Sequence, residues 1–319
     1  MTIEAPRVFG VLVTYRRPDA LTKTLDRLVS QTRRPDRLLV VDNGASGEVS
    51  DLVERAVTSG LPAVYIDAGD NLGPAGGFAL GMEQLLVDAG DEDWVFLFDD
   101  DDPPFFDDAI ADAAGFGAAM VAKDPATGGV GISGGRFDLA RGRVIRVGDA
   151  DIHDAVPVDH ITGGGLPAYR VAAIRKVGVF RRELFFGFEE LEFGLRLTRA
   201  GFRLYADGER WQLRKQVKRD RGLLPSEEIS VERATGTSVR ITSLSWRRYY
   251  SLRNLVFILR EMGAGSAAFR VAVTRGLFKP LLNLPLNPRL GWRGLRIGTR
   301  AAVDGWKGRL GRSVEPETG

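Results

Sequence analysis

Four consecutive aspartates, 99–102, directly follow an apolar segment, Trp94–Phe98. Carboxylates at the end of a buried strand lie close together and are partly dehydrated, so they repel one another unless a cation neutralises them. Hard oxygen ligands suit Mg²⁺ or Mn²⁺, which typically bridge a few carboxylates and a substrate diphosphate. Helix capping is the structural alternative, but a cap needs one aspartate and not four. The run therefore predicts a metal–diphosphate site.

A second candidate segment, residues 71–78, is rich in glycine and precedes a predicted helix. Glycine lets a backbone approach a ligand closely, and a helix N-terminus favours anions. Glycines also simply make turns, and this spacing matches neither the dinucleotide fingerprint nor a Walker loop. Alone, the segment is only a weak indication of a nucleotide pocket.

Glu189, Glu190 and Glu192 cluster at the start of another predicted helix. Acidic residues there favour the helix dipole, which is a purely structural explanation. The functional alternative is a carboxylate general base that projects into a cleft. Combined with a metal–diphosphate site, such a base indicates group transfer from a nucleotide-activated donor. The metal stabilises the departing diphosphate, the base takes a proton from an attacking hydroxyl, and a single displacement inverts the anomeric centre.

The elements that must position these groups alternate along the first hundred residues. Apolar segments predict buried strands at Val8–Thr14, Leu38–Val41, Ala63–Ile66 and Trp94–Phe98, with helices between them. This order predicts an α/β fold with a mostly parallel, doubly wound sheet. Ligands of such sheets bind at the carboxyl ends of the strands, where the first-strand loop, Asp42, the glycine-rich segment and the aspartates all lie.

The later chain suggests three parts. Residues 1–212 form the expected catalytic α/β domain, 213–244 a charged mobile loop, and 245–319 a basic and mostly helical region. A helix is expected over Asp107–Ala122 and another over Glu189–Ala200. Thr162–Gly165 is predicted to be a flexible loop.

Composition excludes several kinds of site. The 319 residues include no cysteine and two histidines, which excludes disulfides, thiolate metal sites and histidine-rich metal sites. Hydrophobic residues make up 44% and charged residues 27%, the balance of a globular protein. We see no secretory signal and no apolar run of about 20 residues that could span a membrane. The expected location is the cytoplasm, either free or on the inner face of the cell membrane.

Taken in order, five segments resemble the family 2 glycosyltransferases of GT-A fold, over about residues 7–212. They are Val13–Pro18, Val40–Gly44, Asn71–Gly77, Phe98–Asp102 and Phe188–Arg196. The glycine-rich segment and the glutamate helix are most similar to bacterial galactofuranosyltransferases and rhamnosyltransferases that build cell-envelope glycans. The resemblance implies an inverting transferase that moves such a sugar from a nucleotide diphosphate to a hydroxyl of a glycan, a lipid-linked acceptor or a small molecule.

The resemblance also implies roles for individual residues. Positions implied to bind the nucleotide are Thr14, Tyr15, Arg16, Asp42, Asn71, Gly73, Asp99 and Asp100. Asp99 and Asp101 are the outer members of the Asp-X-Asp motif that holds Mg²⁺ or Mn²⁺, with Asp101 the direct ligand. Glu190 falls on the catalytic base and Glu189 is the fallback, while Gly163–Gly165 edge the acceptor site. Many relatives complete the metal site with a histidine, where this chain has Gln212, a weaker and neutral ligand.

Other interpretations stay open at this stage. A nucleotidyltransferase shares the fold and the metal chemistry, but its first loop usually contains glycine, and Thr14–Pro18 does not. A non-catalytic, membrane-associated nucleotide-sugar-binding protein is the second alternative. The residues leave the donor open between UDP- and dTDP-sugars. Between Arg260 and Arg312, arginines alternate with apolar side chains, which suits either an anionic membrane surface or a solvated basic face. No nucleic-acid-binding module is recognisable.

Overall fold

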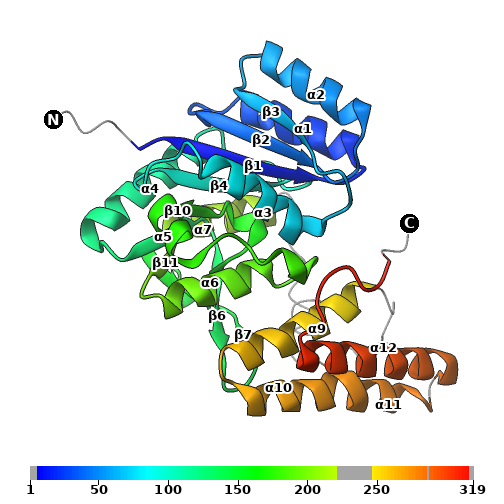
Figure 1. The fold of residues 1–319 in the computed structure, drawn as a ribbon. Helices are drawn as coiled ribbons and strands as arrows, with labels where there is room; N and C mark the ends of the chain where they lie inside the picture. The colour runs from blue at the N-terminus through cyan, green and yellow to red at the C-terminus, as the bar shows by residue number, and fades with distance from the viewer. Residues whose placement is uncertain (1–5, 221–245, 286, 316–319) are drawn as a thin grey trace. The chain divides into compact units, whose positions relative to one another are not determined.

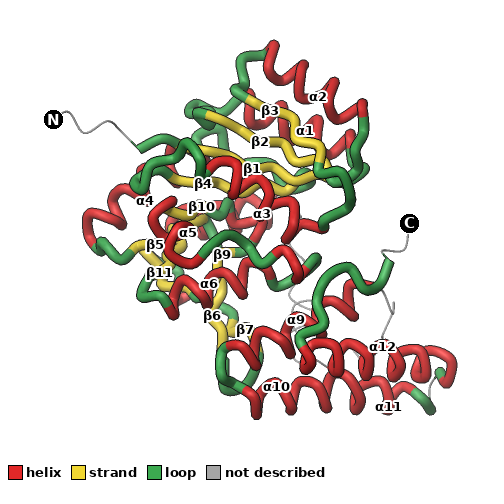
Figure 2. Tube along the Cα trace, viewed as in Figure 1, coloured by secondary structure: helices red, strands yellow, loops and turns green. Residues whose placement is uncertain are grey.

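The computed structural model describes residues 6–220, 246–285 and 287–315. The chain forms two compact units (Figures 1 and 2). Unit 1 comprises Met1–Arg136, Ile145–Phe185 and Glu189–Trp211. Unit 2 comprises Phe137–Val144, Phe186–Phe188 and Gln212–Gly319. Two short segments before residue 212 belong to unit 2, and the expected functional division of the chain stays a prediction.

Unit 1 is built on an eight-stranded sheet with the order β3-β2-β1-β4-β10-β5-β11-β8. Its strands are β1 Val8–Thr14, β2 Arg37–Asp42, β3 Ala63–Asp67, β4 Trp94–Asp99, β5 Thr127–Gly131, β8 Ala155–Val158, β10 Ala168–Arg170 and β11 Arg203–Asp207. The first four strands are mutually parallel. Strand β10 runs antiparallel to its neighbours β4 and β5, and strand β8 runs antiparallel to β11. The predicted α/β fold is confirmed, and the antiparallel insertions are what the sequence did not indicate. A smaller sheet has the order β7-β6-β9, with β6 Gly134–Asp138, β7 Arg143–Ile145 and β9 His160–Ile161.

Helices cover both faces of the large sheet, because successive side chains along each strand point into two different cores. Val8 and Leu12 of β1 pack with α1, α2 and α4, whereas Phe9, Val11 and Val13 pack with α3, α5 and α6. The helices are α1 Pro18–Val29, α2 Gly47–Thr58, α3 Gly73–Leu85, α4 Ala109–Lys123, α5 Val171–Val177 and α6 Glu189–Arg199. A strand buried on both faces reads as a continuous apolar run, which is why β1 was recognisable from its sequence.

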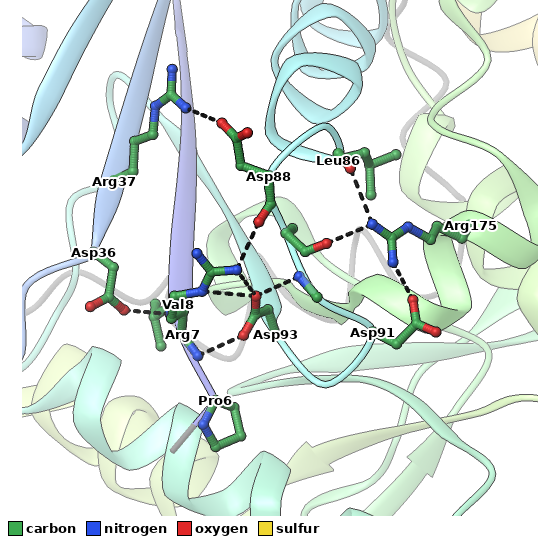
Figure 3. Close-up of polar contacts among 12 residues, drawn as sticks. Pro6, Arg7, Val8, Asp36, Arg37, Leu86, Asp88, Asp91, Asp93 and Arg175 are labelled. Carbon is green, nitrogen blue, oxygen red and sulfur yellow. Dashed lines mark hydrogen bonds and ion pairs between the residues drawn. The ribbon is translucent and has the colours of Figure 1, made fainter. Parts of the chain in front are cut away.

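Charged residues fasten the amino ends of β1 and β4, at the edge of the sheet opposite to the aspartate run (Figure 3). The Arg7 guanidinium donates to both the Asp93 carboxylate and the Asp88 carbonyl. Arg37 pairs with Asp88 at 2.9 Å, and Arg175 pairs with Asp91. These acidic residues therefore have arginine partners and hold the strand ends together.

Apart from α7, Gly208–Asp220, which begins in unit 1 and ends in unit 2, the described part of unit 2 contains four α-helices and a π-helix. They are α9 Trp246–Glu261, α10 Gly265–Val271, the π-helix Ala272–Phe278, α11 Lys279–Asn283 and α12 Pro288–Lys307. Glycines on α12 allow close packing, because a Cβ on Gly298 would lie 2.3 Å from the Gly276 carbonyl oxygen. The predicted helical C-terminal region is confirmed. Within the described residues, no helix has the length and apolar character needed to cross a membrane.

The expected charged loop begins later than predicted. Helix α7, Gly208–Asp220, includes residues 213–220, which the sequence had placed in that loop. The many charged residues and the narrow apolar face of α7 explain why the sequence pattern did not predict a helix here. The rest of the expected loop, 221–244, lies outside the described residues.

Candidate active site

The register of the sheet brings three predicted segments to one edge. Thr14 at the end of β1 pairs with Asp42 at the end of β2, and Val13 pairs with Asp99 at the end of β4. The carboxyl ends of β1, β2 and β4 are therefore level with one another. This is the edge at which ligands of doubly wound sheets bind.

The first loop contacts the aspartate run directly. The Thr14 hydroxyl donates to Asp100 Oδ2 at 2.8 Å, and both side chains are buried. Arg17 forms an ion pair with Asp101 and approaches Asp100 at 3.5 Å. Thr14 and Asp100 are therefore brought together as predicted for neighbours at this edge, whereas the pairing of Arg17 was not anticipated. Tyr15 lies beside them, half-buried, with the exposed Arg16 guanidinium over its ring.

The second loop is held by Asp42 itself. Its fully buried carboxylate accepts hydrogen bonds from the backbone N–H groups of Gly44 and Ser46, both at 2.7 Å. The Tyr65 hydroxyl donates to the same carboxylate at 3.3 Å. Asp42 therefore shapes the loop that follows β2, and its predicted contact with a nucleoside stays a prediction.

The glycine-rich segment is fastened to its neighbours through polar side chains. Asn43 donates to the Gly73 carbonyl at 3.1 Å, and Asn71 Oδ1 accepts from the Gly73 N–H at 3.0 Å. Gly73 has a φ of +68°, and a Cβ there would lie 2.0 Å from the Phe185 carbonyl oxygen. Only glycine fits this position. The segment thus starts α3 while it lies against the backbone that leads toward α6.

Asp99 and Glu190 meet at Gly163. A Cβ on Gly163 would lie 2.9 Å from Asp99 Oδ2 and 3.0 Å from Glu190 Oε1. Asp99 ends β4, Glu190 lies in the first turn of α6, and Gly163 begins a short 3₁₀ helix, Gly163–Gly165. Three segments that are far apart in the sequence therefore bring two carboxylates close to one glycine. The expected flexible loop at 162–165 is in fact partly helical.

Burial and mutual repulsion disfavour the ionised forms of these acids. Burial, then the nearby Glu190 and Asp101 carboxylates, raise the pKa of Asp99 to about 7. Burial also raises the pKa of Glu190. For Asp100 burial again raises the pKa, although the Thr14 hydrogen bond and Arg17 partly oppose it. Acids held this way either retain a proton or need a cation, and perturbed acids at a sheet edge are typical of functional sites.

The three glutamates of α6 have different surroundings. Glu192 is buried and pairs with Arg181 at 3.1 Å and Arg196 at 2.9 Å, so it is structural. Glu189 is buried, whereas Glu190 is partly exposed beside Gly163. The charge of Glu190, one of the two predicted candidates, helps to raise the pKa of Asp99.

Backbone strain gathers around the same edge. Among the described residues other than glycine, positive φ angles occur at Arg16 and Ala45 in the first two loops, at Leu166 after the 3₁₀ helix, and at Phe185 and Phe188 before α6, while a sixth, Asp154, precedes β8 away from these segments. Such conformations persist only where the surrounding structure imposes them, and they concentrate at functional sites. Nothing in the amino-acid types at these positions indicated this.

The metal ligands can be judged from their chemistry. Within the described ranges, no three acidic or histidine side chains converge to form a metal site by themselves. Asp99 and Asp101 nevertheless supply hard oxygens at the edge where a diphosphate would bind, and Mg²⁺ is often held by one or two carboxylates with the remaining ligands from phosphate and water. The donor set thus fits a metal that binds together with a nucleotide. Gln212 lies exposed on α7 in unit 2, and its metal role stays a prediction.

Three further residues that pair with, hold or influence these groups escaped sequence reasoning. Arg17 pairs with the aspartates, Asn43 ties two loops together, and Tyr169 on β10 is fully buried. Burial and the charge of Glu190 raise the pKa of the Tyr169 hydroxyl. A basic residue beside a loop that faces four acids could have indicated Arg17, but no local signal marks the other two.

Known proteins share both the sequence and the fold of this region. Residues 11–112 match the family described as Glycosyl transferase family 2. Over this part of its length the chain is similar to family 2 glycosyltransferases. It is 35% identical over 210 residues to galactofuranosyltransferase GlfT1 of Mycobacterium tuberculosis, covering 61% of this chain and 65% of that protein. Identity to GlfT1 of Mycolicibacterium smegmatis is 46% over 97 residues, 30% of each chain. The chain therefore spans somewhat less than two thirds of the first of these relatives.

Solved structures support the same fold. The mannosyltransferase PcManGT from Pyrobaculum calidifontis, in complex with GDP-Man and Mn²⁺, matches with a TM-score of 0.51 and 16% identity, over 96% of this chain and 88% of its own. S. aureus TarS 1-349 in complex with UDP matches with a TM-score of 0.50 and 16% identity, over 95% of this chain and 92% of its own. At such identities the likeness shows the fold alone, and that fold is GT-A.

Proposed function

We propose that this chain transfers a sugar from a nucleotide diphosphate donor to a hydroxyl group, with inversion at the anomeric carbon. The observation that carries the proposal is that the Asp99 and Glu190 carboxylates both lie close to Gly163. Asp99 lies at the strand end where a donor diphosphate would bind. An acceptor hydroxyl beside Glu190 can then lose its proton as its oxygen attacks the sugar.

Glu190 is the proposed general base. Its burial raises its pKa, and a raised pKa makes a carboxylate a better proton acceptor near neutral pH. The neighbouring Glu192 is neutralised by two arginines and cannot serve in this way. Glu190 takes the proton from the acceptor hydroxyl while the bond between the sugar and the diphosphate breaks, so no covalent enzyme intermediate is needed.

Asp99 and Asp101 are the residues that would hold Mg²⁺ or Mn²⁺. When bound there, the metal neutralises the negative charge of the departing diphosphate. The structures of the neighbouring mannosyltransferase with GDP-Man and Mn²⁺ support a divalent metal as the cofactor. Asp100 lies between Asp99 and Asp101 in the sequence, and the Thr14 hydroxyl donates a hydrogen bond to its carboxylate. Arg17, in the same loop as Thr14, supplies a positive charge.

Substitution of the two neighbouring glutamates tests the base. Glu190→Gln keeps the shape of the side chain but cannot accept the proton, so turnover should fall by about 10²–10⁴-fold. Binding of the nucleotide should change little. Glu189→Gln is the matched control on the same turn and should retain most turnover. Near-normal transfer by the Glu190 variant would remove it from this role.

The donor is proposed to be UDP-galactofuranose, with dTDP-rhamnose as the alternative. The two GlfT1 relatives are named galactofuranosyltransferases, which favours the first. Calorimetric titration with UDP and with dTDP, each with and without Mn²⁺, separates these donors. Tighter binding of UDP with metal is the expected result, and Asp101→Asn should abolish the metal effect. Tighter binding of dTDP than of UDP would favour a rhamnosyl-type donor instead.

Unit 2 supports a contact with an anionic membrane surface. Trp292, which is 63% exposed, and Trp306 lie on α12 with arginines 293, 296 and 300 on the same helix. Exposed aromatic side chains among basic residues favour the boundary of a lipid layer. Such a contact would bring a lipid-linked glycan acceptor to the enzyme. A glycan or small molecule in solution is the alternative acceptor.

Vesicle sedimentation tests this contact. The chain should sediment with vesicles that contain phosphatidylglycerol and much less with pure phosphatidylcholine, and salt should weaken binding. Replacing Trp292 and Trp306 together by alanine should reduce binding at least several-fold. Val87→Ala, which alters an exposed apolar residue of unit 1, is the control. Equal binding by all three proteins would contradict a contact through α12.

A further inference from the structure

Asn254 on α9 holds the short segment that directly precedes α6. Its fully buried side chain donates from Nδ2 to the carbonyls of Phe186 at 3.0 Å and Gly187 at 2.8 Å. Its Oδ1 accepts from Arg253 Nε at 2.9 Å. All of these residues belong to unit 2. Because both ends of the amide are engaged, this side chain has one orientation and fixes two successive carbonyls.

The segment that Asn254 holds is conformationally unusual. Phe185, Gly187 and Phe188 have φ angles of +61°, +82° and +69°. Two of them are aromatic residues, for which this region is strongly disfavoured. Some contact must therefore impose the conformation. The hydrogen bonds from Asn254 hold the two carbonyls between Phe185 and Phe188, and the Trp246 ring packs edge-on against Phe186 with centroids 4.6 Å apart.

The side chains behind Asn254 are themselves buried and hydrogen-bonded. Arg253 is fully buried and donates to the Gly311 carbonyl at 2.6 Å. The Tyr250 hydroxyl accepts from the N–H of Ser313 at 3.0 Å and also donates to the Val314 carbonyl at 2.8 Å. Hydrogen-bonded networks with buried side chains rigidify what they contact. The Asn254 amide is thus anchored on the side away from the segment.

We propose that Asn254 is a positioning residue for sugar transfer. The carbonyls it binds belong to Phe186 and Gly187, and the chain continues through Phe188 into Glu189 and Glu190, the first two residues of α6. By fixing that backbone, Asn254 sets where the helix begins and in which direction the Glu190 carboxylate points. The inference rests on the proposed role of Glu190 as the base.

The test compares Asn254→Ala with Leu255→Ala, a buried neighbour on the same helix whose side chain takes no part in these hydrogen bonds. Small misplacement of a reacting group costs about 10²-fold, so the Asn254 variant should lose about 10- to 100-fold in kcat. Its Kd for UDP by calorimetry should stay within about twofold, because the nucleotide loops are unaltered. Leu255→Ala should lower Tm about as much as Asn254→Ala does and leave kcat nearly unchanged.

A double variant shows whether the effect passes through the base. In the Glu190→Gln background, Asn254→Ala should lower the residual turnover by less than about twofold, because the group it positions is already gone. If Asn254→Ala does not fold, the isosteric Asn254→Asp keeps the contact with Arg253, lacks the two donors, and is measured in the same way.

Three outcomes would overturn the proposal. The first is a loss of kcat no larger than that of Leu255→Ala at equal loss of Tm. The second is a parallel loss of UDP affinity and kcat, which would indicate general disruption. The third is an equal loss in the presence and absence of Glu190. Full activity of the single Glu190→Gln variant is a different result and would instead refute the proposed base.

Discussion

A methyl group placed at Gly163 should inactivate the enzyme without unfolding it. The Cβ of Gly163→Ala would lie 2.9 Å from Asp99 Oδ2 and 3.0 Å from Glu190 Oε1. Ordinary contacts are longer by several tenths of an ångström, so both carboxylates must move apart. The glycine does not have a positive φ, and alanine therefore fits its backbone. The strain falls on the two acids and not on the fold.

The size of the effect follows from the cost of overpacking, which is typically about 1–3 kcal/mol. If that strain is relieved by displacement of the carboxylates, the same free energy is lost from the transition state. This corresponds to about a 5- to 150-fold loss in kcat/KM. Because the side chains move and the core does not, Tm should change by no more than a few degrees.

The assay is transfer of radiolabelled sugar, together with Tm and calorimetric affinity for UDP. Gly115→Ala is the matched control, because a Cβ on that residue of α4 meets nothing within 4 Å. The control should keep full activity. A folded Gly163→Ala enzyme with turnover within twofold of the wild type would refute the reasoning, since it would mean that reactants do not use the space between these carboxylates.

Three further predictions follow from the same geometry. The pKa of Asp99 is 3.8 in the unfolded chain and about 7 in the folded chain, so the stability contributed by protonated Asp99 is lost as pH rises through that window. Asp99→Asn should therefore become progressively more stable relative to the wild type, measured as Tm from pH 4 to 8 in EDTA. Arg17→Gln should tighten Mn²⁺ binding without nucleotide by up to about fivefold in an EPR titration, because the exposed guanidinium no longer competes for Asp101 and such pairs contribute about 0.2–1 kcal/mol. Gly73→Ala should lower the free energy of unfolding by about 2–4 kcal/mol in urea, because its Cβ clashes with the Phe185 carbonyl and its φ is positive.

Local sequence signals were sufficient for the parallel half of the sheet. Strands β1, β2 and β4 are buried on both faces and therefore appear as continuous apolar runs, and their order along the chain fixes a parallel arrangement. Strands β8 and β10 are short and antiparallel, and β10 inserts between β4 and β5. Their placement depends on pairing between distant segments, for which a three- or four-residue stretch carries no signal.

The candidate site was predictable to the extent that its chemistry is encoded in residue types. The aspartate run and Glu190 stood out because carboxylates are unusual at the end of a buried strand or beside one. Asn254 carried no such signal. Its proposed positioning role rests on hydrogen bonds to residues 67 and 68 positions away, and an asparagine in a helix does not by itself indicate such a role. Residues that act on the backbone of a distant segment are invisible until the fold places them there.

The acidic residues between positions 88 and 112 show why charge alone did not separate structure from function. Asp88, Asp91 and Asp93 have arginine partners at the amino ends of the strands, which come from segments before and after them in the chain. Asp99, at the other end of β4, has other acids as its charged neighbours, and its pKa rises accordingly. One strand therefore separates acids that are neutralised by the protein from acids that are left for a cation or a proton. The difference lies in non-local counter-charges, so removing an arginine such as Arg7 should weaken the fold, whereas adding one beside Asp99 should stabilise the fold and abolish the site.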